Sequence, residues 1–315
     1  MRYTIWVVYP IFLLLVLLVV PEVFCRFDGK YTAHRDAVEH RRKNPFTRSW
    51  LDLSVEQVKA DPDSVRIVAV GDSFTHGVTL ELAQTWPIVL KGLLNSQAPT
   101  TGPRYEVVNA GVGGASLLKE VGNIELAVAN LEPDLILHQL FLNDFYLVQK
   151  YEECGDFEAV NRVLRAPEFR FHLSYYGWSV WRTLRHRNTF NSFIVCQGDP
   201  DRPHWQRLRD LFKRNRELLA EHGVEYVVFL VPQMNWEKKD YAFVEFHESV
   251  RQTVSAEVEH YYDLLPPLME EFESAYDYWL DPHYPDAHPN AEVHRAYAAF
   301  VLEILQQIDF VAAPN

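Results

Sequence analysis

Cysteine is scarce in this 315-residue chain, which contains only Cys25, Cys154 and Cys196. No two of them form a Cys-x-x-Cys pair, so the sequence excludes a zinc ribbon. Positive charge is also limited, because 43 acidic residues face 30 basic ones and the net charge is −13. Since nucleic acids are bound by basic surfaces, we expect no nucleic-acid partner.

Two further patterns are missing from the sequence. The Gly-x-Ser-x-Gly elbow does not occur, so a serine nucleophile of the α/β-hydrolase type is excluded. Internal repeats and low-complexity segments are absent as well. With 48% hydrophobic residues, the chain nevertheless has ample apolar material for a packed core.

One long apolar run spans residues 5–24. About twenty residues are enough for a helix to cross a bilayer. A cleaved signal peptide is one alternative, but no small-x-small cleavage site follows the run, which ends in Pro-Glu-Val-Phe. A buried helix of a soluble protein is the other alternative. We expect residues 1–25 to form an uncleaved N-terminal anchor that contacts the membrane through residues 5–24.

Residues 26–63 are charged and irregular, and we expect them to form a stalk or linker. Arg2 favours a cytoplasmic N-terminus, whereas the basic tract at residues 40–43 favours the opposite orientation. That tract is either a solvated run of charge or a contact with lipid headgroups.

From residue 64 onward, segments with strand character alternate with segments of helical periodicity. The predicted strands lie at residues 65–70, 105–109, 135–140, 225–231 and 261–264, and the predicted helices at residues 80–94, 115–130 and 291–308. Such alternation is typical of α/β proteins, in which a parallel sheet is covered on both faces. We therefore predict a three-layer, doubly wound sandwich.

A long insertion interrupts this alternation at about residues 145–202. It mixes aromatic residues with arginines, and it is too long for an ordinary loop. We expect either a lid or substrate wall, or a helical subdomain with its own small core. Cys154 and Cys196 flank the insertion, so they would either form a disulfide that closes it or remain two buried thiols.

The first candidate site segment is Gly-Asp-Ser-Phe-Thr-His-Gly at residues 71–77. It places Ser73 at the point where a buried strand ends and a helix begins, which is where open α/β sheets carry their active groups. The alternative is that Asp72 and Ser73 only cap the helix that follows.

Two further segments follow predicted strands. Residues 109–116, Asn-Ala-Gly-Val-Gly-Gly-Ala-Ser, open a helix and present backbone N–H groups that would suit an anion. A dinucleotide loop is rejected, because Ser116 stands at the sixth position of that pattern and no acidic partner follows at the expected distance. Asn143-Asp144 follows the strand at residues 135–140, and a plain Asn-Asp turn is its alternative interpretation.

The last segment, residues 281–290, precedes the C-terminal helix. Residues i and i+2 of an extended chain face the same side, so Asp286 would hold Nδ1–H of His288 while Nε2 faces Ser73. Asp281 and His283 form a second Asp-x-His pair. All four side chains together would offer oxygen and nitrogen ligands to a metal, but no distant cluster supports that alternative.

In their order along the chain, these segments resemble the sequence blocks of the SGNH (GDSL) hydrolase family. Residues 71–77 resemble block I, with Ser73 at the nucleophile position. The glycine of block II lies five residues after the asparagine and corresponds to Gly114. The asparagine of block III, Gly-x-Asn-Asp, corresponds to Asn143, although Phe141 stands where the family has glycine.

The histidine block of this chain departs from the usual Asp-x-x-His of the family, because Pro285 lies three residues before His288. Asp286-x-His288 matches the shorter Asp-x-His version of some branches. The resemblance thus implies a triad in which Ser73 is the nucleophile, His288 the base and Asp286 the residue that orients the base.

The resemblance also implies an oxyanion hole made by the backbone N–H groups of Ser73 and Gly114 and by the side-chain amide of Asn143. It implies neither a cofactor nor a metal. It covers residues 64–315, which we expect to form an SGNH-type, flavodoxin-like hydrolase domain. The chain would be a membrane-anchored member whose catalytic domain lies outside the cytoplasmic membrane.

The expected function is a serine esterase that hydrolyses acyl or acetyl esters of a lipid or a glycan. An O-acetyltransferase that acts on a cell-surface polysaccharide would use the same acyl-enzyme, with a sugar hydroxyl in place of water. A non-catalytic glycan-binding or assembly protein that retains the fold is the alternative of another class, and Phe141 is the main feature in its favour.

Overall fold

The computed structural model of the chain describes residues 19–23, 63–78, 80–99, 102–145, 174, 177–178, 180–181, 194–196, 198–199, 202–234, 236–237, 240–275, 278 and 288–312. The chain divides into two compact units. The larger one consists of residues 44–149, 194–282 and 286–315, and it contains the sheet and the candidate site. The smaller one includes residues 150–193, which make up most of the predicted insertion. Most of these residues lie outside the described ones.

The larger unit is built on five parallel strands, in the order β2-β1-β3-β4-β5. Their bounds are Val65–Val70 for β1, Tyr105–Asn109 for β2, Leu135–Leu140 for β3, Glu225–Leu230 for β4 and His260–Asp263 for β5. The predicted parallel sheet is therefore confirmed, with β4 ending one residue early and β5 shifted by one residue. The order of the strands reverses beside β1, and open sheets place ligands at such a switch point.

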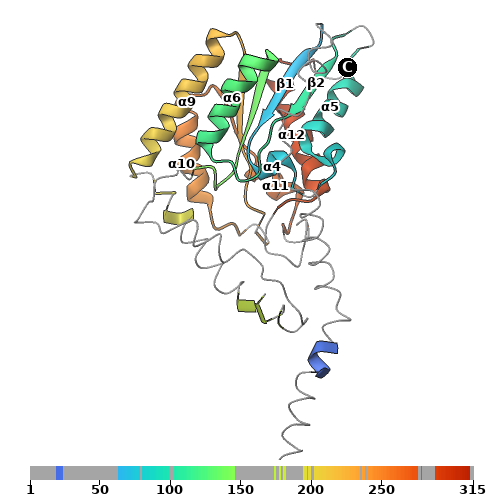
Figure 1. The fold of residues 1–315 in the computed structure, drawn as a ribbon, viewed down its shortest axis with the longest axis vertical. Helices are drawn as coiled ribbons and strands as arrows, with labels where there is room; N and C mark the ends of the chain where they lie inside the picture. The colour runs from blue at the N-terminus through green and yellow to red at the C-terminus, as the bar shows by residue number, and fades with distance from the viewer. Residues whose placement is uncertain are drawn as a thin grey trace, which may run out of the picture. The chain divides into compact units, whose positions relative to one another are not determined.

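Helices cover both faces of this sheet, as Figure 1 shows. The helices α6, α9 and α10 gather on one face, and α5 and α12 pack together on the other. Their bounds are Trp86–Gln97 for α5, Leu117–Leu131 for α6, His204–Glu221 for α9, Val244–Val254 for α10 and Ala291–Gln307 for α12, and a short α11 (Leu265–Glu271) follows β5. The predicted three-layer α/β architecture agrees with this arrangement.

The predicted helix at residues 80–94 is wrong at its start. The chain first forms the short helix α4 (Ser73–His76), which ends at Gly77 in the left-handed conformation, with φ 72°. A 3₁₀ turn, η2 (Leu82–Gln84), follows, and α5 then begins at Trp86. Pro87 lies in the first turn of α5, where its missing N–H leaves no helical hydrogen bond unmade. The proline therefore marks a helix start.

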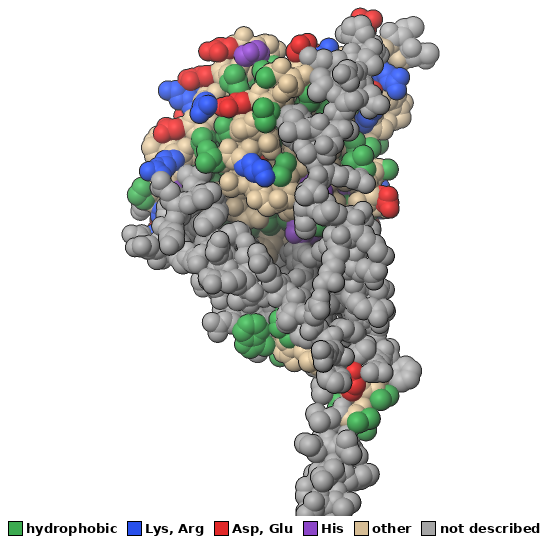
Figure 2. All heavy atoms as spheres, viewed as in Figure 1, with side chains coloured by type: hydrophobic (Ala, Val, Ile, Leu, Met, Phe, Trp, Pro, Cys, Tyr) green, Lys and Arg blue, Asp and Glu red, His purple; other side chains and the backbone are tan. Residues whose placement is uncertain are grey.

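The visible face of the larger unit carries acidic and basic side chains interspersed (Figure 2). An ion pair joins two helices of this unit, since Arg214 of α9 lies 2.6 Å from Glu125 of α6. Exposed pairs of this kind contribute little to stability individually.

The predicted membrane anchor lies mostly outside the described residues, which include only the helical residues 19–23 of the apolar run. Among the helices that the structure describes, none has the length and apolar character needed to cross a membrane. The anchor and the stalk stay predictions.

Candidate active site

The turn after β1 places Ser73 at the start of α4. Gly71 makes this turn possible, because a Cβ atom there would lie 2.3 Å from Thr75 Oγ1 and 2.9 Å from the carbonyl oxygen of Gln139. Asp72 caps α4, since its Oδ1 accepts the N–H of Phe74 at 2.8 Å. Capping and catalysis were alternative interpretations of this segment, and the structure assigns the cap to Asp72 and leaves the Ser73 hydroxyl for other contacts.

The structure brings Ser73 and His288 together, although 215 residues separate them in the chain. His288 Nε2 lies 2.8 Å from Ser73 Oγ. The hydroxyl also lies within donating distance of Asp72 Oδ2, at 3.2 Å. The single hydroxyl proton therefore has two acceptors in reach, the Asp72 carboxylate and, at the shorter distance, the imidazole nitrogen of His288.

The position of His288 is set by the cap of α12, Asn290, which lies two residues further on. Asn290 caps this helix, with its Oδ1 accepting the N–H of Glu292 at 2.9 Å and of Val293 at 3.2 Å. The N–H of Asn290 in turn donates to the carbonyl oxygen of Tyr278 at 2.9 Å. His288 is thus tied to a well-capped helix. The other residues of this predicted site, Asp281, His283 and Asp286, lie outside the described residues.

The glycine-rich loop after β2 is held tightly against the Ser73 turn. The N–H of Val112 donates to the carbonyl oxygen of Gly71 at 3.0 Å. A Cβ atom on Gly111 would lie 2.2 Å from the backbone nitrogen of His76, so only glycine permits this approach. Gly114 has φ +69° and an exposed backbone, with no atom within 4 Å of the position a Cβ would take. The loop that carries the predicted oxyanion N–H is therefore packed on α4, with Gly114 itself open.

Asn143 lies in the turn that follows β3, next to the switch point of the sheet. Asp144 closes this turn, because its side chain accepts the N–H of Phe141 and its own N–H donates to the carbonyl oxygen of Phe141 at 3.0 Å. The side chain of Asn143 is half-buried, and its Oδ1 is buried without a partner among the described residues. No hydrogen bond joins its Nδ2 to another described residue, and Nδ2 is not among the buried polar atoms that lack a partner, so it is available as a donor.

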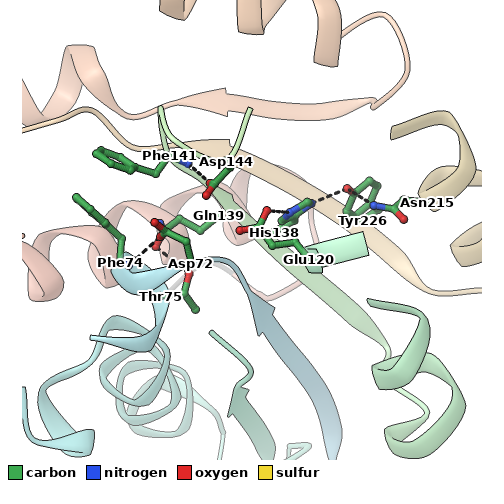
Figure 3. A network of polar contacts seen from close by, with 10 residues as sticks. All are labelled: Asp72, Phe74, Thr75, Glu120, His138, Gln139, Phe141, Asp144, Asn215 and Tyr226. Carbon is green, nitrogen blue, oxygen red and sulfur yellow. Dashed lines mark hydrogen bonds and ion pairs between the residues drawn. The ribbon is translucent and has the colours of Figure 1, made fainter. Parts of the chain in front are cut away.

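Phe141, which stands where block III has glycine, is part of the packing beside Ser73. Its ring stacks on that of Phe74 with 3.9 Å between centroids, and both side chains are buried (Figure 3). The ring of Phe74 also contacts the imidazole of His288, with centroids 5.0 Å apart. The aromatic residue therefore supports the neighbours of Ser73.

Burial and hydrogen bonding act in opposite directions on Asp72. Desolvation raises the pKa of its carboxyl group, and donors from Phe74 and Ser73 lower it, with a net value of about 6. Around neutral pH this carboxylate is charged and accepts its hydrogen bonds, which keeps α4 capped.

Several residues that organise the site were not predicted from the sequence. Asn109 Nδ2 donates to the carbonyl oxygen of Thr75, and Asn109 Oδ1 accepts the N–H of Gly111. A second group surrounds β3, where the two polar residues His138 and Gln139 are fully buried. Two polar residues within an otherwise apolar strand were the signal that would have pointed to this group.

Within the described ranges, no group of three His, Cys, Asp or Glu side chains is arranged to hold a metal ion. The predicted alternative of a metal at Asp281, His283, Asp286 and His288 rests on residues of which only His288 is described.

The sheet order, Ser73 after β1 and His288 before the last helix are the features to compare with known proteins. The sequence matches the GDSL-like lipase/acylhydrolase family over residues 69–296. This match covers more than half of the chain and includes Ser73, Gly114, Asn143 and His288. The chain therefore belongs to the GDSL-like lipase/acylhydrolase family, and it is an ester-hydrolysing enzyme.

Solved structures with a related fold include TesA, which is 15% identical with a TM-score of 0.45 over 77% of this chain and 98% of that chain. The psychrotrophic esterase EstA from Pseudoalteromonas sp. is 11% identical, with a TM-score of 0.46 over 78% and 99% of the two chains. The acetyl xylan esterase AlAXEase is 14% identical, with a TM-score of 0.42 over 76% and 98%. No curated protein matches the chain. These likenesses are too weak to add to the family assignment.

Proposed function

We propose that this protein is a serine esterase that cleaves acyl or acetyl esters of a lipid or a glycan. Ser73 is the nucleophile, His288 the general base and Asp286 the group that orients the base. The observation that supports this most directly is the 2.8 Å contact between His288 Nε2 and Ser73 Oγ. The non-catalytic alternative, which Phe141 favoured, is weakened because Phe141 packs beside this contact without displacing it.

The reaction follows from these positions. Ser73 Oγ attacks the ester carbonyl carbon while its proton passes to His288 Nε2, and the carbonyl oxygen becomes an oxyanion. The oxyanion is stabilised by the N–H groups of Ser73 and Gly114 and by Asn143 Nδ2. The intermediate collapses, the ester C–O bond breaks, and the leaving alkoxide takes the proton from His288. Water then attacks the acyl-enzyme with His288 as base, which releases the carboxylic acid and restores Ser73.

We further propose that the domain works outside the cytoplasm, held by an anchor at residues 5–24. Cys196 is disulfide-bonded, and disulfides persist in oxidising compartments. The partner that the sequence predicts, Cys154, lies outside the described residues.

The deciding experiment is intact-mass analysis of the full chain in detergent after treatment with a fluorophosphonate probe, with Ser73→Ala alongside. A single adduct that is absent from the variant supports an activated Ser73. A folded wild-type protein that forms no adduct, even with a probe of minimal size, contradicts the serine esterase. Acetate release from acetylated glycan, with and without an acceptor glycan, then separates hydrolysis from acetyl transfer.

A further inference from the structure

Two carboxyl groups meet behind the candidate site. Glu120 lies near the start of α6 and Asp144 in the turn after β3, and both are fully buried. Figure 3 draws the two side chains next to each other, and the N–H of Leu117, one turn before Glu120, donates to the carbonyl oxygen of Asp144 at 2.8 Å, which holds the start of α6 against this turn. The pKa values agree with this placement, since each carboxyl group influences the pKa of the other. Yet Glu120 Oε1 and Asp144 Oδ1 have no donor among the described residues. Buried acceptors that face each other without a donor are strongly unfavourable.

The other oxygen of each carboxyl group is occupied, as Figure 3 shows. Asp144 Oδ2 accepts the backbone N–H of Phe141. Glu120 Oε2 lies 3.1 Å from His138 Nε2. Burial lowers the pKa of His138 to about 3, so this imidazole is neutral near physiological pH and does not balance a negative charge.

The proton on His138 can be placed from its second neighbour. His138 Nδ1 lies 2.8 Å from the oxygen of Tyr226, whose pKa is raised by burial, so the phenol keeps its proton. That oxygen accepts from Asn215 Nδ2 at 3.4 Å, which leaves the Tyr226 proton for His138 Nδ1. Neutral His138 therefore carries its proton on Nε2 and donates it to Glu120. Glu120 is an acceptor at this contact, and Asp144 Oδ1 is the natural place for a proton between the two acids.

No other group in the described structure compensates a negative charge on this pair of carboxyl groups. Burial and the charge of Asp72 raise the pKa values of Glu120 and Asp144 well above their usual range. The titratable groups that face them are Asp72 from the turn after β1, His138 from β3 and, through His138, Tyr226 from β4. No described lysine or arginine contacts either carboxyl, and the described residues form no metal-binding group here.

We infer that Glu120 and Asp144 share one proton, and that this proton ties together the two loops carrying the proposed oxyanion donors Gly114 and Asn143. The second half of the inference rests on the proposed esterase function. A backbone bond runs beside the shared proton, because the N–H of Leu117 donates to the carbonyl oxygen of Asp144 at 2.8 Å. The start of α6 and the turn after β3 are thus joined at two points.

Loss of the shared proton would leave two carboxylates facing each other without water. Their repulsion would separate the two loops and displace the donors from the oxyanion. Glu120 and Asp144 are therefore positioning residues, and loss of their shared proton as the pH rises lowers kcat and leaves KM unchanged. A misplacement of about 1 Å in such a site reduces the rate by about 100-fold.

Infrared spectroscopy of the full chain tests the proton itself, independently of any activity. At a pH well above 6, where Asp72 is ionised, the wild type should show the carbonyl stretch of a buried protonated carboxyl group. In Glu120→Gln the new amide donates to Asp144, so the band should vanish. Asp263→Asn, which removes the carboxylate bound to His247 elsewhere in the fold, should leave it unchanged. A wild type without the band, or a band that survives Glu120→Gln, overturns the shared proton.

The pH profile of ester turnover tests the positioning role. Glu120→Gln should keep kcat at alkaline pH where the wild type loses it, and Glu120→Ala should lose about 100-fold in kcat at every pH. Identical alkaline limbs in the wild type and Glu120→Gln overturn the role. A chain that shows the infrared band but neither labels at Ser73 nor cleaves esters supports the shared proton and overturns the esterase, and with it the positioning role.

Discussion

The ring of Phe141 stacks on the ring of Phe74 with 3.9 Å between centroids and 22° between planes. Phe74 follows Ser73 in the chain, and its ring also contacts His288. An aromatic residue at the glycine position of block III thus packs behind the ring that contacts the proposed base.

Phe141→Leu should therefore reduce kcat roughly 10-fold to 100-fold, because the support of His288 is loosened. The free energy of unfolding should fall by about 1–2 kcal/mol, the scale of removing a few buried carbon atoms. Phe145→Leu is the matched control, since Phe145 is equally buried but packs against Trp205 and Phe246. It should lose similar stability and retain kcat. Equal kcat in the two variants would contradict the supporting role.

Asn143→Ala should lower kcat by a factor corresponding to about 3 kcal/mol, because one donor to the oxyanion is lost. KM should change little, since the contact strengthens only in the transition state. Asn130→Ala, at the far end of α6, should leave steady-state kinetics as they are. Unchanged turnover in Asn143→Ala would remove this residue from the oxyanion hole.

Asp286→Asn tests the residue proposed to orient the base. An amide at this position favours the wrong imidazole tautomer, and kcat should fall about 10⁴-fold. Asp281→Asn provides the comparison, because Asp281 belongs to the second Asp-x-His pair of the same segment. If Asp281→Asn lowers kcat more than Asp286→Asn does, Asp281 would have to replace Asp286 as the acid of the triad.

Gly111→Ala should destabilise the fold by about 1–3 kcal/mol, the range found for overpacking. The added Cβ would lie 2.2 Å from the backbone nitrogen of His76, and a backbone atom yields less easily than the end of a flexible side chain. Gly122→Ala on α6 meets no atom within 4 Å and should instead stabilise the protein by up to about 1 kcal/mol. Chemical denaturation gives the free energy of unfolding of each variant. A change of the same sign in both variants would refute the prediction.

The pH dependence of stability should depend on Asp72. Its pKa is about 6 in the native state and roughly 3.9 in the unfolded chain, so the native state binds the proton more tightly. Its contribution to stability is fully present below about pH 4 and is lost as the pH rises through 6. In Asp72→Asn, which keeps the cap on α4, this fall should be shallower by up to about 3 kcal/mol. If the curves of unfolding free energy against pH are parallel for the wild type and Asp72→Asn, the pKa of Asp72 is not raised in the native state.

Much of the fold could be predicted because its signals are local. Buried parallel strands are short β-branched or apolar runs, and each predicted strand was found within one residue of its place. The start of α5 was misplaced because Leu80 and Leu82 fit a helical pattern, whereas the left-handed Gly77 and the start at Trp86 depend on packing of the turn. Helix ends are set by caps and by tertiary contacts as much as by periodicity.

The alternation of strands and helices and the ordered sequence blocks were sufficient to predict the sheet and the family, because both depend on residue types at fixed local spacing. The contact between Ser73 and His288 and the stacking of Phe141 on Phe74 follow only from the folded chain. The same holds for the proposed pairing of the buried Glu120 and Asp144. These contacts join residues from different strands and helices, and burial changes the protonation of the carboxyl groups among them. A carboxyl group becomes a shared-proton partner only where folding has removed water and placed a second acid beside it.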